Sequence, residues 1–249
     1  MHKLFKIIVF LLSILGLASA ELWGATYYSN TASGRIANTL ANWSLNADGS
    51  GGAPATWDHT FIIQSADSMV LNATWGDGSA SMNVTINSGA TLNLNGNTLS
   101  SVMNLLTING NRNAYSGAIN NSSATAATIQ EDIVLGSNSS LTAELGNISI
   151  SGNITTAGFE ALFNGAEDFT ISGIISGSGS VYRTGAGDLA LSAANTFSGL
   201  TTINSNTGGS ISISNASALG TTDAGVIITT GSLNISTNLT VLGETVTIL

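Results

Sequence analysis

Short apolar alternations recur along this sequence at a nearly constant step. Triplets in which one small or polar residue separates two apolar residues begin at Ile148, Phe169, Leu189, Ile211 and Leu233, with steps of 21, 20, 22 and 22 residues. The period of two within each triplet predicts a short β-strand with one buried face. The constant step predicts a solenoid in which each coil lays one strand above the previous one.

The composition agrees with a chain of many short strands and corners. It contains 29 Gly and one Pro, and 43% of its residues are hydrophobic while only 8% are charged. Gly and Asn suit tight corners, and Pro is excluded from paired strands because it has no N–H to donate. We therefore predict an all-β fold, a parallel β-helix with an N-terminal cap. An antiparallel β-sandwich is the alternative, but it does not account for the constant step.

The first twenty residues have the pattern of a secretory signal peptide. Lys3 and Lys6 give a positive start, residues 7–17 are apolar, and the small residues Ala18 and Ala20 mark the cleavage site. The apolar stretch of 11 residues is too short to span a bilayer, which argues against a membrane anchor. We expect segment 1–20 to be removed and the protein to be secreted or held at the cell surface.

The charge balance after residue 20 is strongly acidic. Arg35, Arg112 and Arg183 are the basic residues of that part, and all 14 Asp and Glu residues also lie there, so its formal net charge is −11. Without a basic patch, nucleic acid is not expected as a partner. The chain has no Cys, so its stability must come from packing and backbone hydrogen bonds.

One stretch carries a recognisable motif. Residues 175–203, followed by the sequence SNASALG at 214–220, resemble the autotransporter-associated β-strand repeat. Arg183 replaces a Lys of that pattern, Ala193 replaces a Gly and Phe197 replaces a Tyr. The resemblance implies a right-handed parallel β-helix exported to the surface of a bacterial outer membrane. The residues assigned to the repeat motif are Gly185, Gly187, Leu189, Leu191, Asn195, Thr196, Phe197, Gly199, Thr201 and Ile203.

The motif residues have expected structural roles. Leu189, Leu191 and Ile203 should form layers of the core, and Phe197 should fill the coil interior at a corner. Asn195 and Gly199 should allow the backbone to turn.

The chain divides into three expected parts. They are a signal peptide at 1–20, an N-terminal cap module at 21–60 and β-helix repeats at 61–249. Residues 41–63 also look like the module that precedes such repeats in the family. Because autotransporters are anchored by a C-terminal membrane barrel, membrane contact is expected only through an anchor that would follow Leu249.

Candidate catalytic and metal-binding residues are few. His59 follows Asp58, but no G-x-S-x-G elbow supplies a nucleophile, so we interpret His59 as a surface or cap residue. One His without any Cys does not make a zinc site. Asp77 lies between glycines but lacks the other ligands of a calcium loop, so a turn is expected there. No cofactor and no metal are predicted.

Two pairs of acidic residues are also candidates for a catalytic site. Glu131 and Asp132 are neighbours and should point to opposite faces of a strand. Asp168 and Asp188 are 20 residues apart, about one coil, and both precede inward-facing residues, so they should stack on the outer face. They are the best enzymatic candidates, but mild surface repulsion is the expected outcome because no cation is evident beside them.

The tryptophans gather near the N-terminus. A solenoid needs a distinct cap, and bulky aromatic residues cover an exposed core well, so we favour a plug over a sugar-binding face. The four tryptophans are Trp23, Trp43, Trp57 and Trp75.

Three function classes follow from these observations. We favour an exported structural or adhesin-like surface protein, a β-helical rod without catalysis, whose partners are surface glycans or other cell-surface proteins. The alternatives are a carbohydrate-binding module acting through the Trp-rich N-terminus, and a polysaccharide lyase or hydrolase on the same scaffold. Ice binding is disfavoured because a Thr-x-Thr motif does not recur at the coil period.

Overall fold

The computed structural model describes residues 25–29, 35–54, 56–75, 82–100, 103–110, 117–236, 238–241 and 243–249. The predicted signal peptide with Ala18 and Ala20 lies outside these residues. Trp23, Asp77 and Arg112 also lie outside them.

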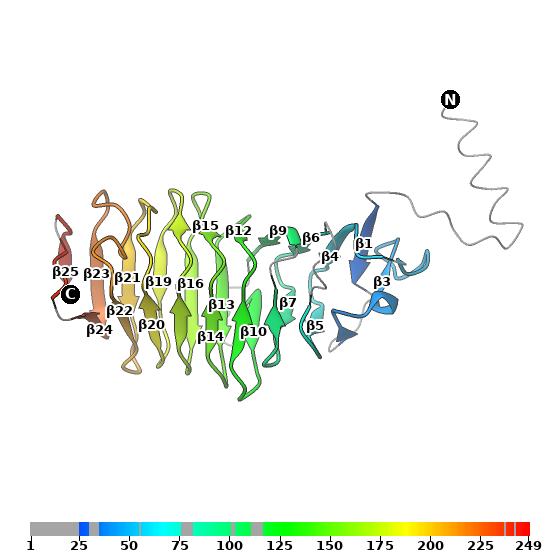
Figure 1. The fold of residues 1–249 in the computed structure, drawn as a ribbon, viewed down its shortest axis with the longest axis horizontal. Coiled ribbons are helices and arrows are strands. Elements are labelled where there is room, and N and C mark those ends of the chain that lie inside the picture. The colour runs from blue at the N-terminus through cyan, green and yellow to red at the C-terminus, as the bar shows by residue number, and fades with distance from the viewer. Residues whose placement is uncertain are drawn as a thin grey trace, which may run out of the picture.

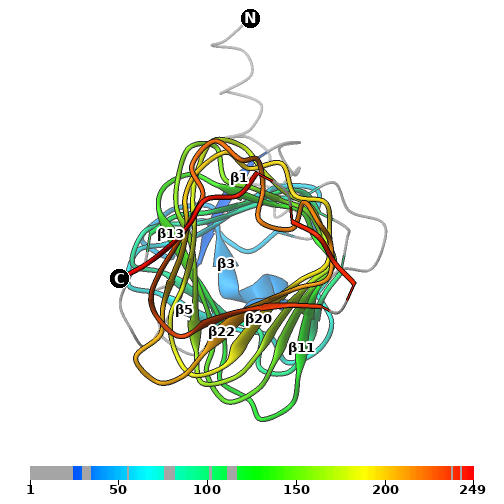
Figure 2. The ribbon, with the colours of Figure 1, turned by 90° about the vertical axis from the view of Figure 1, so that its left-hand side faces the viewer.

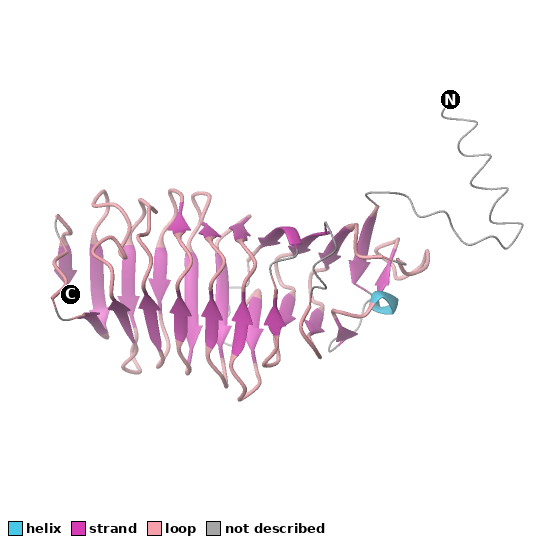
Figure 3. Ribbon diagram, in the orientation of Figure 1, coloured by secondary structure: helices cyan, strands magenta, loops and turns pink. Residues whose placement is uncertain are grey.

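The described chain winds into an all-β solenoid of about eight turns (Figure 1). Three sheets form the walls of the rod, and their strands pair in parallel except at the N-terminal end. Almost the whole regular structure is strand (Figure 3). We call the three sheets sheet A with eight strands, sheet B with ten and sheet C with seven. A typical coil contributes one strand to each sheet, and loops connect them at the corners.

The strands of each sheet follow one another along the rod. Sheet A consists of β1 (Thr26–Ser29), β3 (Trp43–Ser44), β4 (Thr60–Ile63), β6 (Met82–Ile86), β9 (Met103–Ile108), β12 (Ile133–Leu135), β15 (Ile154–Thr155) and β18 (Ile175–Ser176). Sheet B consists of β2 (Arg35–Ile36), β5 (Ser68–Val70), β7 (Thr91–Asn93), β10 (Ile119–Asn121), β13 (Ser139–Ala143), β16 (Ala161–Gly165), β19 (Val181–Arg183), β21 (Thr201–Asn204), β23 (Val226–Thr230) and β25 (Val246–Ile248). Sheet C consists of β8 (Thr98–Leu99), β11 (Ala127–Ile129), β14 (Ile148–Ile150), β17 (Phe169–Ile171), β20 (Asp188–Leu191), β22 (Ser210–Ile213) and β24 (Ser232–Ile235).

The solenoid is right-handed. Seen from its C-terminal end, β13 of sheet B lies on the left, β20 of sheet C at the bottom and β1 of sheet A at the top (Figure 2). Each coil runs from sheet B to sheet C to sheet A while advancing toward the viewer, with the crossing from C to A on the right. The chain therefore turns counterclockwise while it advances toward the viewer, which is the sense of a right-handed helix. The predicted fold class is confirmed.

The register of sheet C confirms the rungs that the sequence period predicts. Ile148 pairs with Phe169, Phe169 with Leu189, Leu189 with Ile211, and Ile211 with Leu233. All four pairings are parallel. A constant step thus places the same strand position above itself in successive coils, and the inward-facing side chains stack into columns.

The interior of the coil is a continuous apolar core. Alternating strand positions point inward, and these hold mainly Leu, Ile, Val and Phe with exposed fractions near zero. Burial of such side chains is worth about 1.5–3 kcal/mol each, which supplies the main stabilisation in a chain without disulfides. Parallel backbone hydrogen bonds between coils satisfy the strands.

The N-terminal end of the rod differs from the rest. β1 already pairs in parallel with β4, so the parallel stack begins inside the segment 21–60 that the sequence assigns to the cap. β3 pairs antiparallel with β1 at the end of sheet A. The 3₁₀ helix η1 (Leu40–Asn42) leads directly into β3. β3 and η1 therefore lie at the N-terminal end of the parallel stack.

Candidate functional site

The repeat motif forms one coil of the rod. Leu189 and Leu191 lie on β20, Thr201 and Ile203 lie on β21, and their side chains are buried. Phe197 lies at the corner between these strands and is fully buried. Thr196 beside it is exposed, and its backbone N–H donates to the carbonyl oxygen of Ile175. These side chains are therefore arranged for stacking between coils.

Asn195 joins three successive coils. Its Oδ1 accepts from the backbone N–H of Ile175 at 2.8 Å, and its Nδ2 donates to the carbonyl oxygen of Ala218 at 2.6 Å. The side chain is buried, and Asn195 is absent from the described residues with positive φ. Its role is to bind the coils on either side through its side-chain amide, whereas the expected role was to allow the backbone to turn.

The motif glycines are required because adjacent coils approach closely. A Cβ at Gly199 would lie 2.4 Å from the carbonyl oxygen of Gly179, although the backbone of Gly199 is not left-handed. Gly185 has φ +91°, and a Cβ there would lie 2.3 Å from the carbonyl oxygen of Gly165. Both positions therefore exclude any side chain, and only Gly185 also needs glycine for its φ.

Arg183 is a buried cation in this coil, a role that the sequence reasoning missed. Its side chain is 0% exposed and points into the interior from β19. Nε donates to the carbonyl oxygen of Gly187 at 3.1 Å, and Nη1 donates to that of Phe163 at 3.1 Å. Nη2 also donates to Gly187, and the guanidinium lies 5.9 Å from the centre of the Phe169 ring. The pattern Arg-x-x-x-Gly, in which the cation can reach a carbonyl four residues on, was the available signal.

Burial lowers the pKa of Arg183 to about 10, and the nearby carboxylates of Asp188 and Asp168 act in the opposite direction. A desolvated guanidinium is costly, so backbone carbonyls and these two acids compensate it in part. The expectation that no cation lies near the acid pair was therefore wrong: the cation is on the inner side of the wall.

Asp168 and Asp188 lie on neighbouring coils, as predicted, and are linked by hydrogen bonds. Oδ1 of Asp168 accepts from the backbone N–H of Asp188 at 2.7 Å. The N–H of Asp168 in turn donates to Oδ1 of Asn147 at 3.1 Å. Asp188 accepts from the hydroxyls of Ser210 and Ser212 through its two carboxylate oxygens. The pair thus takes part in a chain of side-chain and backbone hydrogen bonds that ties four coils together.

The acid pair Glu131 and Asp132 lies just before β12 and not within a strand as expected, but its two side chains do differ in exposure. Asp132 is exposed, whereas Glu131 is 5% exposed and its Oε2 accepts from the backbone N–H of Met103 at 2.7 Å. Asp132 accepts from the N–H of Asn153 at 2.7 Å on the next coil. Both carboxylates therefore cap backbone N–H groups of neighbouring coils.

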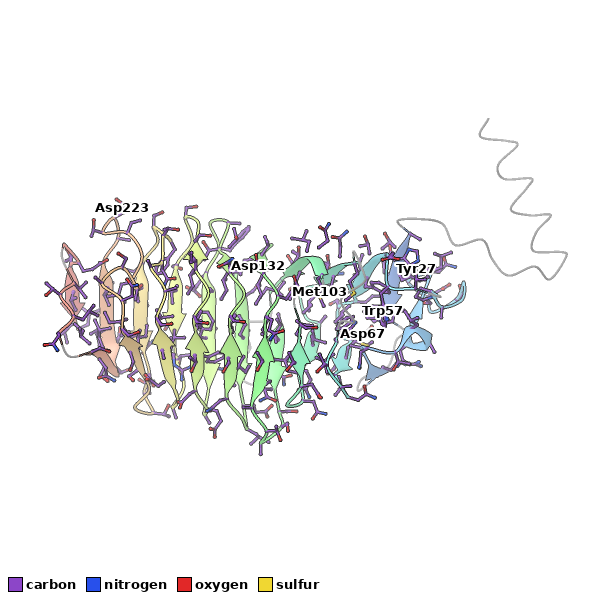
Figure 4. The ribbon with its side chains drawn as sticks, in the orientation of Figure 1. Tyr27, Trp57, Asp67, Met103, Asp132 and Asp223 are labelled. Carbon is purple, nitrogen blue, oxygen red and sulfur yellow. The ribbon has the colours of Figure 1, made fainter. Side chains whose placement is uncertain are left out.

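The aromatic residues of the N-terminal end pack together inside the first coils. Tyr27 and Trp57 lie at that end of the rod (Figure 4). Trp43 contacts Phe61 with ring centres 5.0 Å apart, and Trp57 contacts Trp75 at 5.7 Å. Trp43 and Trp75 are 1% and 2% exposed, so they present no ring face to a sugar. Among the described tryptophans, Trp57 alone is partly exposed.

His59 belongs to this cluster. Its side chain is 4% exposed, and its ring lies 4.9 Å from the ring of Tyr27. Of the two interpretations of His59, the surface position was wrong and the cap position holds. A histidine packed in this way is not accessible to a substrate.

A polar cluster of Asp67, Ser29 and Gln64 lies near the N-terminal end of the rod. Asp67 is buried, and its Oδ2 accepts from the hydroxyl of Ser29. The Ser29 hydroxyl in turn accepts from the backbone N–H of Gln64 at 3.0 Å. Desolvation raises the pKa of Asp67, while the bond from Ser29 and the charge of Arg35 act to lower it. The cluster joins sheet A to the first strands of sheet B.

The described residues hold no cluster of three or more His, Asp or Glu side chains arranged to bind a metal ion. In that same part of the chain, no helix has the length and apolar character needed to cross a bilayer.

Comparisons with known proteins identify no relative: no family model, no curated protein and no solved structure matches this chain.

Proposed function

We propose that this chain is an exported structural or adhesin-like surface protein, a rod of autotransporter-associated β-strand repeats without catalysis. The proposal is supported by the contacts that the motif residues within 183–203 make with neighbouring coils. The buried apolar residues, the amide and the cation of the motif all bind neighbouring parts of the solenoid. A coil built in this way extends a rod, and it leaves the outer faces to meet partners.

The candidate catalytic groups support the non-catalytic assignment. General acid–base chemistry needs a titratable group within reach of a substrate. His59 is packed against Tyr27, and both carboxylate oxygens of Asp188 already accept from serine hydroxyls. These contacts favour a structural role for each group.

The localisation and partners follow from the same proposal. The signal-like segment 1–20 directs export, and the acidic, lysine-free remainder presents polar faces to other surfaces. The partners are surface glycans or other cell-surface proteins.

Export is tested by expressing residues 1–249 in a Gram-negative bacterium and measuring the mass of the product outside the cytoplasm. We expect cleavage after Ala20. A full-length chain retained in the cytoplasm contradicts export.

The absence of catalysis is tested on the purified mature chain with pectin, alginate and cellulose. We expect no new reducing ends and no unsaturated products. Turnover that disappears in Asp168→Asn or Asp188→Asn, while His59→Ala retains it, contradicts the proposal in favour of a polysaccharide-degrading enzyme.

Adhesion is tested with beads that carry the mature chain. We expect these beads to attach to glycan-coated or cell-derived surfaces more than beads carrying an unrelated acidic protein. Equal attachment of both contradicts the adhesin-like role.

A further inference from the structure

The outer face of sheet C carries a continuous row of small side chains, all of them polar except Ala190. Its strands β8 to β24 pair in parallel, and the central outward residue of each strand lies directly beside that of the next. We call this row the hydroxyl face. Its residues are Thr98, Thr128, Ser149, Thr170, Ala190, Ser212 and Asn234.

A second polar row borders the hydroxyl face. One residue past each of the six strands from β11 to β24, the chain places an exposed Gln or Ser. No side chain of either row is larger than Gln, so the surface is flat. The residues of this bordering row are Gln130, Ser151, Ser172, Ser192, Ser214 and Ser236.

The middle of the hydroxyl face has unused hydrogen-bonding capacity. Ser149 and Thr170 are exposed, and neither hydroxyl has a hydrogen bond within the described part of the chain. Toward the C-terminal end, by contrast, Ser212 donates to Asp188 and accepts from Asn234. A hydroxyl can donate and accept at the same time, which suits a ligand rich in hydroxyls.

The other two faces lack this character. The central outward row of sheet A includes Ile62 and Val134, and Leu105 and Ile174 beside it are 42% and 44% exposed. On sheet B the outward side chain of Ser140 is only 1% exposed. Sheet C therefore provides the one long, open face of small and mainly polar side chains among the described residues.

The charges of the face select against anionic ligands. Asp168 and Asp188 lie at its edge, and neither row contains Lys, Arg or His. The cation nearest these acids, Arg183, is buried in the interior. An anionic glycan would meet like charge without a compensating cation, so the face suits a neutral ligand.

The distance between successive strands of the sheet, here called rungs, restricts the class of ligand further. Strands of a sheet lie about 4.8 Å apart, so two rungs span about 9.6 Å. The disaccharide repeat of an extended β-1,4-linked glycan is close to this distance. A chain of that kind laid along the rod axis would bring equivalent hydroxyls to every second rung. A helical glycan cannot keep that register on a flat surface.

We propose that the hydroxyl face binds neutral, extended β-1,4-linked glycans such as cellulose, with the chain running along the rod axis. This inference rests on the adhesin-like function proposed above and names the ligand class of that function. It moves glycan recognition from the tryptophans of the cap to the outer wall of sheet C.

The test is a pull-down of the mature chain with microcrystalline cellulose and with soluble cello-oligosaccharides, alongside amylose and polygalacturonate. We expect binding to both β-1,4-linked glucans and at least tenfold weaker binding to the helical and the anionic polymer. The key variant is Thr170→Glu, which adds a charged, protruding side chain to the hydroxyl face. Its matched control is Thr155→Glu, an exposed threonine on the outer face of sheet A.

Thr170→Glu should weaken cellulose binding at least tenfold, whereas Thr155→Glu should leave it unchanged. The double variant Ser149→Ala/Thr170→Ala removes two hydroxyls without adding a protruding side chain. It should bind cellulose at least fivefold more weakly than wild type. It also keeps the proposal testable if Thr170→Glu does not fold. Equal effects of Thr170→Glu and Thr155→Glu, or wild-type binding by the double variant, overturn the proposal.

A wild-type chain that binds no β-1,4-linked glucan also overturns this inference. That result leaves the proposed function standing, because export, absence of turnover and attachment to cell-derived surfaces are measured separately. A chain that binds cellulose but attaches no better than the control to any other surface contradicts the broader adhesin-like function alone.

Discussion

Arg183 is a long cationic side chain that lies fully buried in a mainly apolar core. Replacing it by Ala removes three donated hydrogen bonds to Gly187 and Phe163 and leaves a cavity beside Phe169. We expect Arg183→Ala to lower the free energy of unfolding by about 2–5 kcal/mol, as for other long buried side chains.

Arg183→Met is the matched variant, because it retains most of the volume without the charge. It should cost only about 1–3 kcal/mol, since the desolvation penalty disappears together with the hydrogen bonds. Urea unfolding monitored by circular dichroism compares the two. If Met costs as much as Ala, the hydrogen bonds rather than the packing determine the effect.

Asp67 makes stability depend on pH at the N-terminal end. Because burial raises the pKa of its carboxyl above the usual value of 3.8, the folded state holds the proton more tightly than the unfolded state does. Stability from this group is therefore present at low pH and is lost as the pH rises through the window above 3.8. Asp67→Asn keeps an acceptor for Ser29 and should melt at a higher temperature than wild type at pH 7.

The difference between Asp67→Asn and wild type should vanish when the pH falls below 3.8, where the carboxyl is protonated in both states. Thermal melts at several pH values measure this. A variant that is less stable than wild type at pH 7 contradicts the prediction, since it would mean that the ionised carboxyl is net stabilising.

His59 provides a third test at the residue scale. A surface histidine would tolerate substitution, but this ring is buried between Tyr27 and Phe61. We expect His59→Ala to destabilise the protein by about 1–3 kcal/mol through the cavity it leaves. Thermal melts followed by tryptophan fluorescence report on this end of the rod. Ser149→Ala, on the exposed wall, should have no effect on the melting temperature, and a silent His59→Ala would show that the cap repacks.

Between elements, the coils are joined by side-chain amides as well as by strand pairing. Asn195 accepts from the N–H of Ile175 and donates to the carbonyl of Ala218. Asn195→Asp keeps the acceptor but turns the donor into an oxygen that faces a carbonyl oxygen. We expect a loss of about 1–3 kcal/mol in denaturant unfolding. The exposed neighbour Thr196 serves as control, because Thr196→Ala should change little; equal effects of the two variants would contradict a specific role for the amide.

The same elements show what the sequence could and could not predict. The strands of sheet C were predictable because only one of their faces is buried, which leaves a period of two in the residue pattern. β13 (Ser139–Ala143) is buried on both faces, so its sequence carries no such alternation. The acid pair on neighbouring coils followed from the repeat length. The inward position of Arg183 did not, since its only signal is the local pattern Arg-x-x-x-Gly, and the period of two in apolar residues does not include a cation.

For the whole molecule, the decisive property is that each coil contacts mainly its neighbours. In such a solenoid, stability is close to a sum of coil and interface contributions, so damage should remain local. Leu191 is 1% exposed and pairs with Ile171 on one side and Ile213 on the other. Leu191→Asp buries a carboxylate without a partner, which costs several kcal/mol.

Hydrogen exchange with mass spectrometry can locate this damage along the rod. We expect peptides from residues 169–213 to lose protection in Leu191→Asp, while peptides from β4 and β6 keep the wild-type rate. Ala190→Asp places the same charge one residue away on the outer wall and should leave both regions protected. Uniform loss of protection along the chain would instead show that the rod unfolds as one cooperative unit, because disruption of a single rung would then be transmitted through every parallel pairing to the N-terminal cap.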